Sequence, residues 1–192
     1  MSALHRRNLP HLYFEEGKYF ITYRLAGSIP ISKLFEQKYT ATKNNSKQFI
    51  RLFRKYDKLM DSKQHGINCL ENPEVADICK ASLHYPNGKD YRLICYTIMP
   101  NHVHLVFELL PGNKGISKIM QSIKRVSARK SNVFLGRTGK FWQDESFDRW
   151  IRDETELYNI IKYVLLNPVE AGLVRRWDEY KNTYCHKDFI VL

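Results

Sequence analysis

Runs of apolar residues bounded by turn residues predict three strands. Residues 18–25 (KYFITYRL) and 90–99 (DYRLICYTIM) are rich in aromatic and β-branched side chains, and glycine, proline or asparagine residues flank them. A third apolar run covers about 102–109 and follows a Met-Pro-Asn turn at 99–101. Because so short a connection joins the second and third runs, we predict an antiparallel hairpin there.

Apolar residues at spacings of three and four predict helices elsewhere. They indicate a mostly helical region over 32–85, a helix over about 116–132 and a last main helix over about 154–166. Within the first region, Asn-Pro-Glu at 72–74 is a strong helix start, because it offers a capping asparagine, a proline in the first helical position and an acid in the first turn. A short aromatic strand is expected over 140–150.

Length and composition indicate one globular domain. The 192 residues are 43% hydrophobic, which is enough to build a core. We predict a single domain over 1–192, with a helical insertion at about 32–85 and a basic, aromatic tail over 177–192. No apolar run approaches the ~20 residues of a membrane span, and no apolar segment follows the basic N-terminus. A cytoplasmic, nucleoid-associated protein is therefore expected, with no membrane partner.

The charge balance favours a polyanionic partner. The chain has 31 Lys and Arg against 20 Asp and Glu, a formal charge of +11, and contacts with phosphates would release counterions. One face of the helix predicted over 116–132 carries a basic stripe with a hydroxyl group, at spacings of four, three and four. A phosphate backbone suits such a stripe, but an ordinary exposed helix face explains it equally well. The stripe consists of Lys118, Ser122, Arg125 and Arg129.

Other basic residues lie outside that helix. Those near the N-terminus form either a DNA-binding arm or a solvated tail, and those at 137–140 form a basic turn. We count them as candidate DNA contacts together with two arginines that follow the last helix. The candidates are Arg6, Arg7, Arg137, Lys140, Arg175 and Arg176.

Two histidines stand two positions apart at the start of the third predicted strand. Residues i and i+2 of a strand point to the same face, so His102 and His104 present two imidazoles side by side. Val103 and Leu105 then point the other way, into a core. Paired neutral imidazoles on a rigid scaffold can begin a divalent-metal site. A bare His-x-His pair is also common on half-exposed strands, so its meaning depends on what lies nearby.

A tyrosine and an asparagine share one flank of the last predicted helix. Tyr163 lies beside the apolar core face, and Asn167 lies four residues later over the same flank. Pro168 follows, so the helix is expected to end or kink there. A half-buried tyrosine and a helix-ending asparagine are the ordinary interpretation. With the histidines, however, an amide oxygen could complete a cation site, and a tyrosine hydroxyl could attack phosphorus as a covalent nucleophile.

Two longer motifs contain these residues. The first is Met-Pro-Asn-His-Val-His-Leu-Val at 99–106, and the second is Tyr-Val-Leu-Leu-Asn-Pro-Val-Glu-Ala-Gly-Leu-Val at 163–174. The pair resembles the HUH single-tyrosine transposases, most closely their REP-associated branch. The segment Phe-Trp-Gln-Asp-Glu-Ser-Phe-Asp-Arg at 141–149 also resembles that family's tryptophan-glutamine segment. The resemblance covers about 90–175, and more loosely 6–30.

This resemblance implies both a fold and an activity. The fold is a ferredoxin-like α+β domain, in which helices pack on one face of an antiparallel sheet and the histidines lie on a central strand. The activity is cleavage of single-stranded DNA beside a hairpin, with Mg²⁺ or Mn²⁺, to leave a 5′-phosphotyrosine and a free 3′-OH. His102 and His104 match the metal-binding histidines of the family, Asn167 matches the third metal ligand, and Tyr163 matches the nucleophile.

One position departs from the family pattern. Glu170 stands where many relatives carry Arg or Lys. The DNA contact expected there is therefore lost, or it is supplied by Arg175 or Arg176.

Three functions remain open from the sequence. The first is the DNA-cleaving and strand-transferring enzyme. The second is a domesticated hairpin-binding protein that keeps a basic groove but has little catalysis. The third is a metal nuclease that uses water, with Tyr163 merely structural. Either a monomer or a homodimer is compatible with each.

Overall fold

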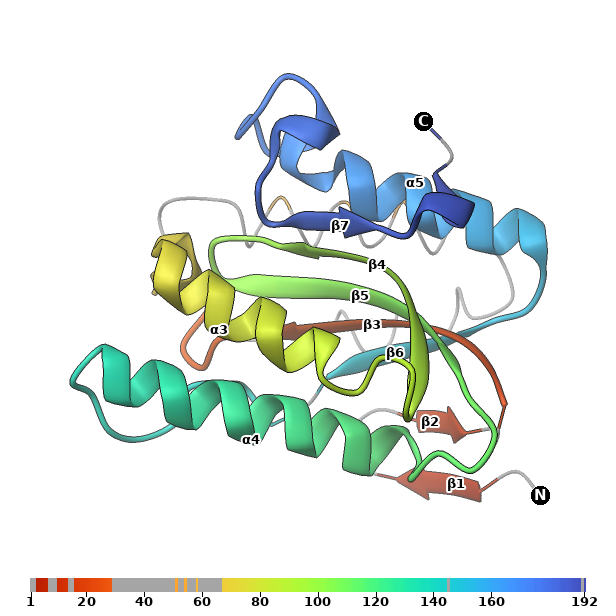
Figure 1. Ribbon diagram of the computed structural model, residues 1–192, viewed down its shortest axis with the longest axis horizontal. Helices are drawn as coiled ribbons and strands as arrows, with labels where there is room; N and C mark the ends of the chain where they lie inside the picture. Colours follow the sequence, from red (N-terminus) through yellow and green to blue (C-terminus); the bar gives the residue numbers. More distant parts are fainter. Residues whose placement is uncertain are drawn as a thin grey trace.

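A five-stranded antiparallel sheet forms the centre of the computed structural model, in the strand order β6-β3-β5-β4-β7 (Figure 1). A separate two-stranded hairpin, β1-β2, precedes it in the chain. The structure describes residues 3–6, 10–13, 16–28, 51, 54, 58, 67–144, 146–190 and 192. The strands are β1 (Ala3–Arg6), β2 (Pro10–Tyr13), β3 (Gly17–Arg24), β4 (Tyr91–Ile98), β5 (His102–Leu109), β6 (Phe147–Ile151) and β7 (Thr183–Cys185).

The three predicted strands are confirmed as β3, β4 and β5, and the predicted hairpin joins β4 to β5. The aromatic strand expected over 140–150 is confirmed only in its second half, as β6. Sequence reasoning missed the other strands. The segment interpreted as a basic arm or tail forms β1 and β2, and part of the C-terminal tail forms β7 at the sheet edge.

Three helices are described along their whole length. They are α3 (Pro73–His84), α4 (Ile116–Phe134) and α5 (Glu154–Glu170). The predicted start of α3 is confirmed, because the Asn72 side chain accepts hydrogen bonds from the backbone N–H groups of Glu74 and Val75. Most of the helical prediction over 32–66 lies outside the described residues. Single 3-10 turns occur at Cys69–Glu71, Trp177–Glu179 and Lys187–Phe189.

The helices cover both faces of the sheet. On one face, Val103, Leu105 and Phe107 of β5 belong to a core cluster that includes residues of α3 and α4. On the other face, where α5 lies (Figure 1), Val106 belongs to a cluster with residues of that helix. The sequence had predicted Val103 and Leu105 in a core, facing away from the histidines, and the alternation of β5 confirms this.

The α+β class and the antiparallel sheet are confirmed. The expected placement of helices on one face holds for α3 and α4, whereas α5 packs on the opposite face. The physical reason is that β5 is buried along almost its whole length, so both of its faces need cover. No helix in the described ranges is both long and apolar enough to cross a membrane.

Candidate active site

The two histidines lie on β5, the middle strand of the sheet, on the face that α5 covers. Both side chains are fully buried. Their Nε2 atoms lie 3.1 Å apart, with the rings nearly perpendicular. The predicted pairing of His102 and His104 on one face is therefore confirmed, but the pair is enclosed by the protein instead of being half exposed.

Neighbouring polar side chains orient both imidazoles. His102 Nδ1 lies 2.7 Å from Asn101 Oδ1, and His104 Nδ1 lies 2.8 Å from Thr22 Oγ1. Because an amide oxygen only accepts, His102 carries its proton on Nδ1 and directs the Nε2 lone pair toward His104. Thr22 stands directly opposite His104 in the β3–β5 register. Burial lowers the pKa of His104 to about 3, so this ring is neutral near pH 7.

The spacing of the two Nε2 atoms suits a shared divalent cation. Metal–nitrogen bonds of about 2.1 Å at a right angle would place two ligand nitrogens about 3 Å apart. The observed 3.1 Å between the Nε2 atoms of His102 and His104 matches that geometry, and a cation would replace the proton that this N···N contact shares. In the described ranges, no group of three His, Cys, Asp or Glu side chains is arranged to hold a metal. Within those ranges, a third protein ligand would be an amide or a hydroxyl oxygen.

Tyr163 of α5 packs directly against this pair. Its ring centroid lies 5.4 Å from that of His104 and 6.0 Å from that of Phe20, which in turn stacks on His104. Tyr163 and Asn167 are only 1% and 3% exposed. The sequence had placed them beside the core. They are buried instead, because α5 covers the polar face of the sheet.

Of the two outcomes predicted at Pro168, an end or a kink, the end of the helix is wrong. The helix continues to Glu170 with the proline inside it. Pro168 has no N–H to bond the carbonyl of Val164, four residues earlier. The Thr97 hydroxyl of β4 donates to that carbonyl instead, at 3.0 Å, and also lies 2.9 Å from the Thr183 hydroxyl of β7. This contact anchors the helix on the sheet one residue after Tyr163.

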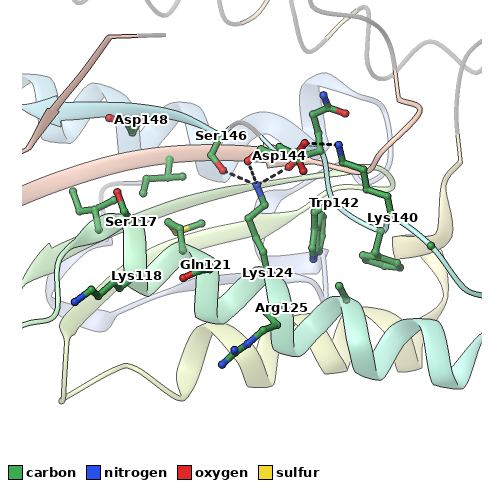
Figure 2. Close-up of a pocket in the computed structure, with 17 residues that line it drawn as sticks. Ser117, Lys118, Gln121, Lys124, Arg125, Lys140, Trp142, Asp144, Ser146 and Asp148 are labelled. Carbon is green, nitrogen blue, oxygen red and sulfur yellow. Dashed lines mark hydrogen bonds and ion pairs between the residues drawn. The ribbon is translucent and has the colours of Figure 1, made fainter. Parts of the chain in front are cut away.

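A basic groove lies on the opposite face of the molecule. It has a volume of about 670 Å³ and runs between α4 and the segment at 139–148 (Figure 2). Of the predicted stripe, Lys118 and Arg125 line the groove, whereas Ser122 and Arg129 do not. Lys140 lines it as well, on the other side. The stripe is therefore split: Ser122 lies between Lys118 and Arg125 without lining the groove, and Arg129 follows Ala128, the last residue of α4 that lines it.

The cations of the groove differ in their partners. Lys124, which the sequence did not single out, donates to the carbonyls of Gln143 and Asp144 and to Ser146 Oγ (Figure 2). Lys140 pairs with the Asp144 carboxylate at 2.6 Å. Lys118 and Arg125 are exposed on α4 and form no ion pair with any described carboxylate. They are the groove cations best placed to meet a phosphate.

The remaining predicted DNA contacts are scattered. Arg137 lies over the Phe141 ring, 5.7 Å from its centroid. Arg176 pairs with Asp178 at 2.6 Å, and Arg175 is exposed. Arg6 ends β1, and Arg7 is outside the described residues. Glu170, the departure from the family pattern, pairs with Arg54 at 3.0 Å.

Comparisons with known proteins agree with this architecture. Residues 68–165, about half of the chain, match the family of IS200-like transposases. A Haemophilus influenzae protein assigned to the REP-associated tyrosine transposases is 25% identical over 114 residues, which cover 55% of this chain and 62% of that protein. The REP-associated tyrosine transposase of Escherichia coli K12 is 20% identical over 100 residues, which cover 52% and 58%. The aligned part of the chain thus spans about three fifths of these relatives.

A solved structure shares the fold. It is a REP-associated tyrosine transposase bound to a REP hairpin, with a TM-score of 0.54, 16% sequence identity, and coverage of 95% of this chain and 82% of that one. The antiparallel sheet with histidines on its central strand and a tyrosine on the covering helix is the arrangement expected of the single-tyrosine transposase class. The chain belongs to the IS200-like transposase family, and its REP-associated relatives match the resemblance expected from the motifs.

Proposed function

We propose that the protein cleaves single-stranded DNA beside a hairpin and holds the new 5′ end on Tyr163. The observation that carries this proposal is the contact of the Tyr163 ring with His104, whose Nε2 atom lies 3.1 Å from that of His102. The proposed nucleophile and the two proposed cation ligands thereby share one buried face. The IS200-like family membership supports the same function.

In the proposed reaction, Tyr163 Oη forms a bond to phosphorus and the bond from phosphorus to the 3′-oxygen breaks. The phenolic proton is lost, and the departing 3′-oxygen gains a proton to become a free 3′-OH. The products are a 5′-phosphotyrosine and that 3′-OH. Because the phosphotyrosine conserves the ester, a second 3′-OH can displace the tyrosine without ATP.

His102 and His104 would hold Mg²⁺ or Mn²⁺, and the amide oxygen of Asn167, one helical turn after Tyr163, would be the third ligand. The spacing of the two Nε2 atoms fits such an ion. The ion would supply positive charge to the phosphate and to the leaving oxygen. Asn101 and Thr22 would keep both rings in the orientation that ligation requires.

Hairpin DNA is the proposed partner. The REP-associated relative of known structure is bound to a REP hairpin. In this chain, Lys118 and Arg125 are exposed in the groove of Figure 2 and would contact phosphates. Since α5 packs on its own sheet, one chain contains the histidines and the tyrosine together, which supports action as a monomer.

A single set of reactions tests this function. The protein is incubated in Mn²⁺ with end-labelled single-stranded hairpin oligonucleotides taken from DNA that flanks its own gene, and the products are separated on denaturing gels. Wild type should form a covalent adduct that Tyr163→Phe and His102→Ala both lose. Cleavage that survives Tyr163→Phe would indicate water as the nucleophile. Retarded hairpin on native gels, with neither cleavage nor adduct, would indicate a binding protein.

A further inference from the structure

An arginine is buried beside the histidines. Arg24 is the last residue of β3 and stands directly opposite His102 in the β3–β5 register, so both side chains leave the sheet on the face of α5. Its side chain is 6% exposed. The sequence offered only an arginine near the end of a strand. The pairing with a residue 78 positions later places it at the site.

Within the described part of the chain, the hydrogen bonds of Arg24 reach only neutral groups. One terminal nitrogen, Nη1, donates to the Ser28 carbonyl and lies 3.3 Å from Ser28 Oγ. Its Nε atom is buried and donates to no acceptor in the described part of the chain. No carboxylate in the described ranges pairs with the guanidinium. A buried cation with only neutral partners is costly, so the position calls for an anion from outside.

A second arginine on the same face shows how the fold compensates such a charge. Arg149 of β6 is 5% exposed and stands opposite Phe20 in the β3–β6 register. Its Nε donates to Glu156 of α5 at 2.7 Å, and Arg152 donates to the other carboxylate oxygen at 3.0 Å. Burial raises the pKa of Glu156, but the hydrogen bonds from Arg152 and Arg149 outweigh this and hold it below its usual range. Arg149 is thus neutralised within the fold.

We propose that Arg24 binds the non-bridging oxygens of the scissile phosphodiester, next to His102. This inference rests on the proposed function and adds a catalytic residue to it. A guanidinium presents parallel N–H donors that match two phosphate oxygens, and Ser28 holds it in place from one side. In a buried site, a fixed cation stabilises the charge that builds on the phosphoryl group as Tyr163 attacks.

The test neutralises one phosphate at a time. In a Tyr163→Phe background, which cannot form the adduct, binding of the hairpin oligonucleotide is measured by fluorescence anisotropy in Mn²⁺. A methylphosphonate, which has no charge, replaces each phosphate of the single-stranded flank in turn. With Arg24 present, one replacement should weaken binding about 10- to 100-fold. With Arg24→Gln added, the same replacement should change binding less than about threefold.

Matched variants separate this inference from structural effects. Arg149→Gln, which disturbs the compensated arginine, should keep the full methylphosphonate penalty, and Arg24→Lys should keep part of it. The melting temperature of each variant reports its folding. Equal penalties with and without Arg24 would overturn the inference, and so would a sensitive phosphate other than the one that wild type cleaves. Absence of any adduct from wild type would instead overturn the proposed function.

Discussion

The two faces of the central sheet bury different kinds of side chain. The face toward α3 and α4 buries aromatic and aliphatic residues, such as Phe107 stacked on Tyr91 with ring centroids 4.6 Å apart. The face toward α5 adds to its apolar residues a set of buried polar ones. These are Thr22, Arg24, Thr97, His102, His104, Arg149, Glu156 and Asn167. The same strand, β5, serves both faces, because its side chains alternate.

Because the two faces bury different side chains, stability and catalytic activity should depend on them to different extents. Apolar burial dominates on the α3 and α4 face, and its few buried polar groups, such as the Trp142 indole N–H that donates to Ser127 Oγ, are paired locally. Polar groups on the α5 face lose hydration, and specific contacts such as those of His104 with Thr22 and of Val164 with Thr97 offset part of that cost. Removing an apolar side chain from the α3 and α4 face should therefore cost mainly stability, whereas removing the Tyr163 hydroxyl on the α5 face should cost mainly activity.

The largest contrast is expected between Phe107→Ala and Tyr163→Phe. Removing the Phe107 ring leaves a cavity in the apolar face and should lower the free energy of unfolding by about 3–5 kcal/mol. Tyr163→Phe keeps the ring that contacts His104, so it should change stability by less than about 1 kcal/mol while abolishing the adduct. Urea unfolding and the adduct gel measure the two effects. Equal destabilisation by both substitutions would contradict the division between the faces.

Mild acid should weaken the metal-free protein through the α5 face. The folded-state pKa of His104 is about 3, below its usual value near 6.5. Between these values the unfolded chain binds a proton that the folded protein does not, so stability falls as pH falls through this window. The expected slope is about 1.4 kcal/mol per pH unit below pH 6.5, and none from this group above it.

Urea unfolding in a chelator at pH 7, 6 and 5 measures this slope. His104→Gln is the control. Its slope of unfolding free energy against pH should be smaller than that of wild type by about 1.4 kcal/mol per pH unit, the contribution of one proton. A slope unchanged by that substitution would show that other groups govern the acid response.

A smaller effect is expected where α5 docks on the sheet. Thr97→Val leaves the Val164 carbonyl without its donor and should cost about 1–3 kcal/mol of stability. Pro168→Ala restores a backbone N–H to that carbonyl, so Thr97→Val should cost clearly less in the Pro168→Ala background. A double-mutant cycle by urea unfolding measures this coupling. Additive effects would show that the threonine and the proline act independently.

The smallest effect is expected at the groove on the far side of the sheet. Lys118→Ala removes one exposed cation and should weaken hairpin binding only a few-fold. It should also reduce the slope of log affinity against log salt by about 0.7–0.9. Lys130 is also exposed on α4 but does not line the groove, so Lys130→Ala is the matched control and should leave the slope unchanged. Equal changes from both lysines would indicate non-specific attraction.

Local sequence patterns were sufficient for the elements that depend on near neighbours. The alternation around His102 and His104 predicted their shared face, because a strand has a period of two. The Asn72 cap followed from residue types within three positions. Tyr163 and Asn167 share a flank because a helix repeats every 3.6 residues. Each of these inferences needed only one element.

Tertiary structure decided everything that joins distant elements. The register of β3 against β5 places Thr22 and Arg24 beside the histidines, and nothing in either segment alone encodes that register. The β4 threonine that satisfies Val164 allows α5 to continue past Pro168, although local rules favour an end or a kink there. Burial of both faces of β5 required α5 to lie opposite α3 and α4. Such features depend on contacts between residues far apart in the chain, so local periodicity does not report them.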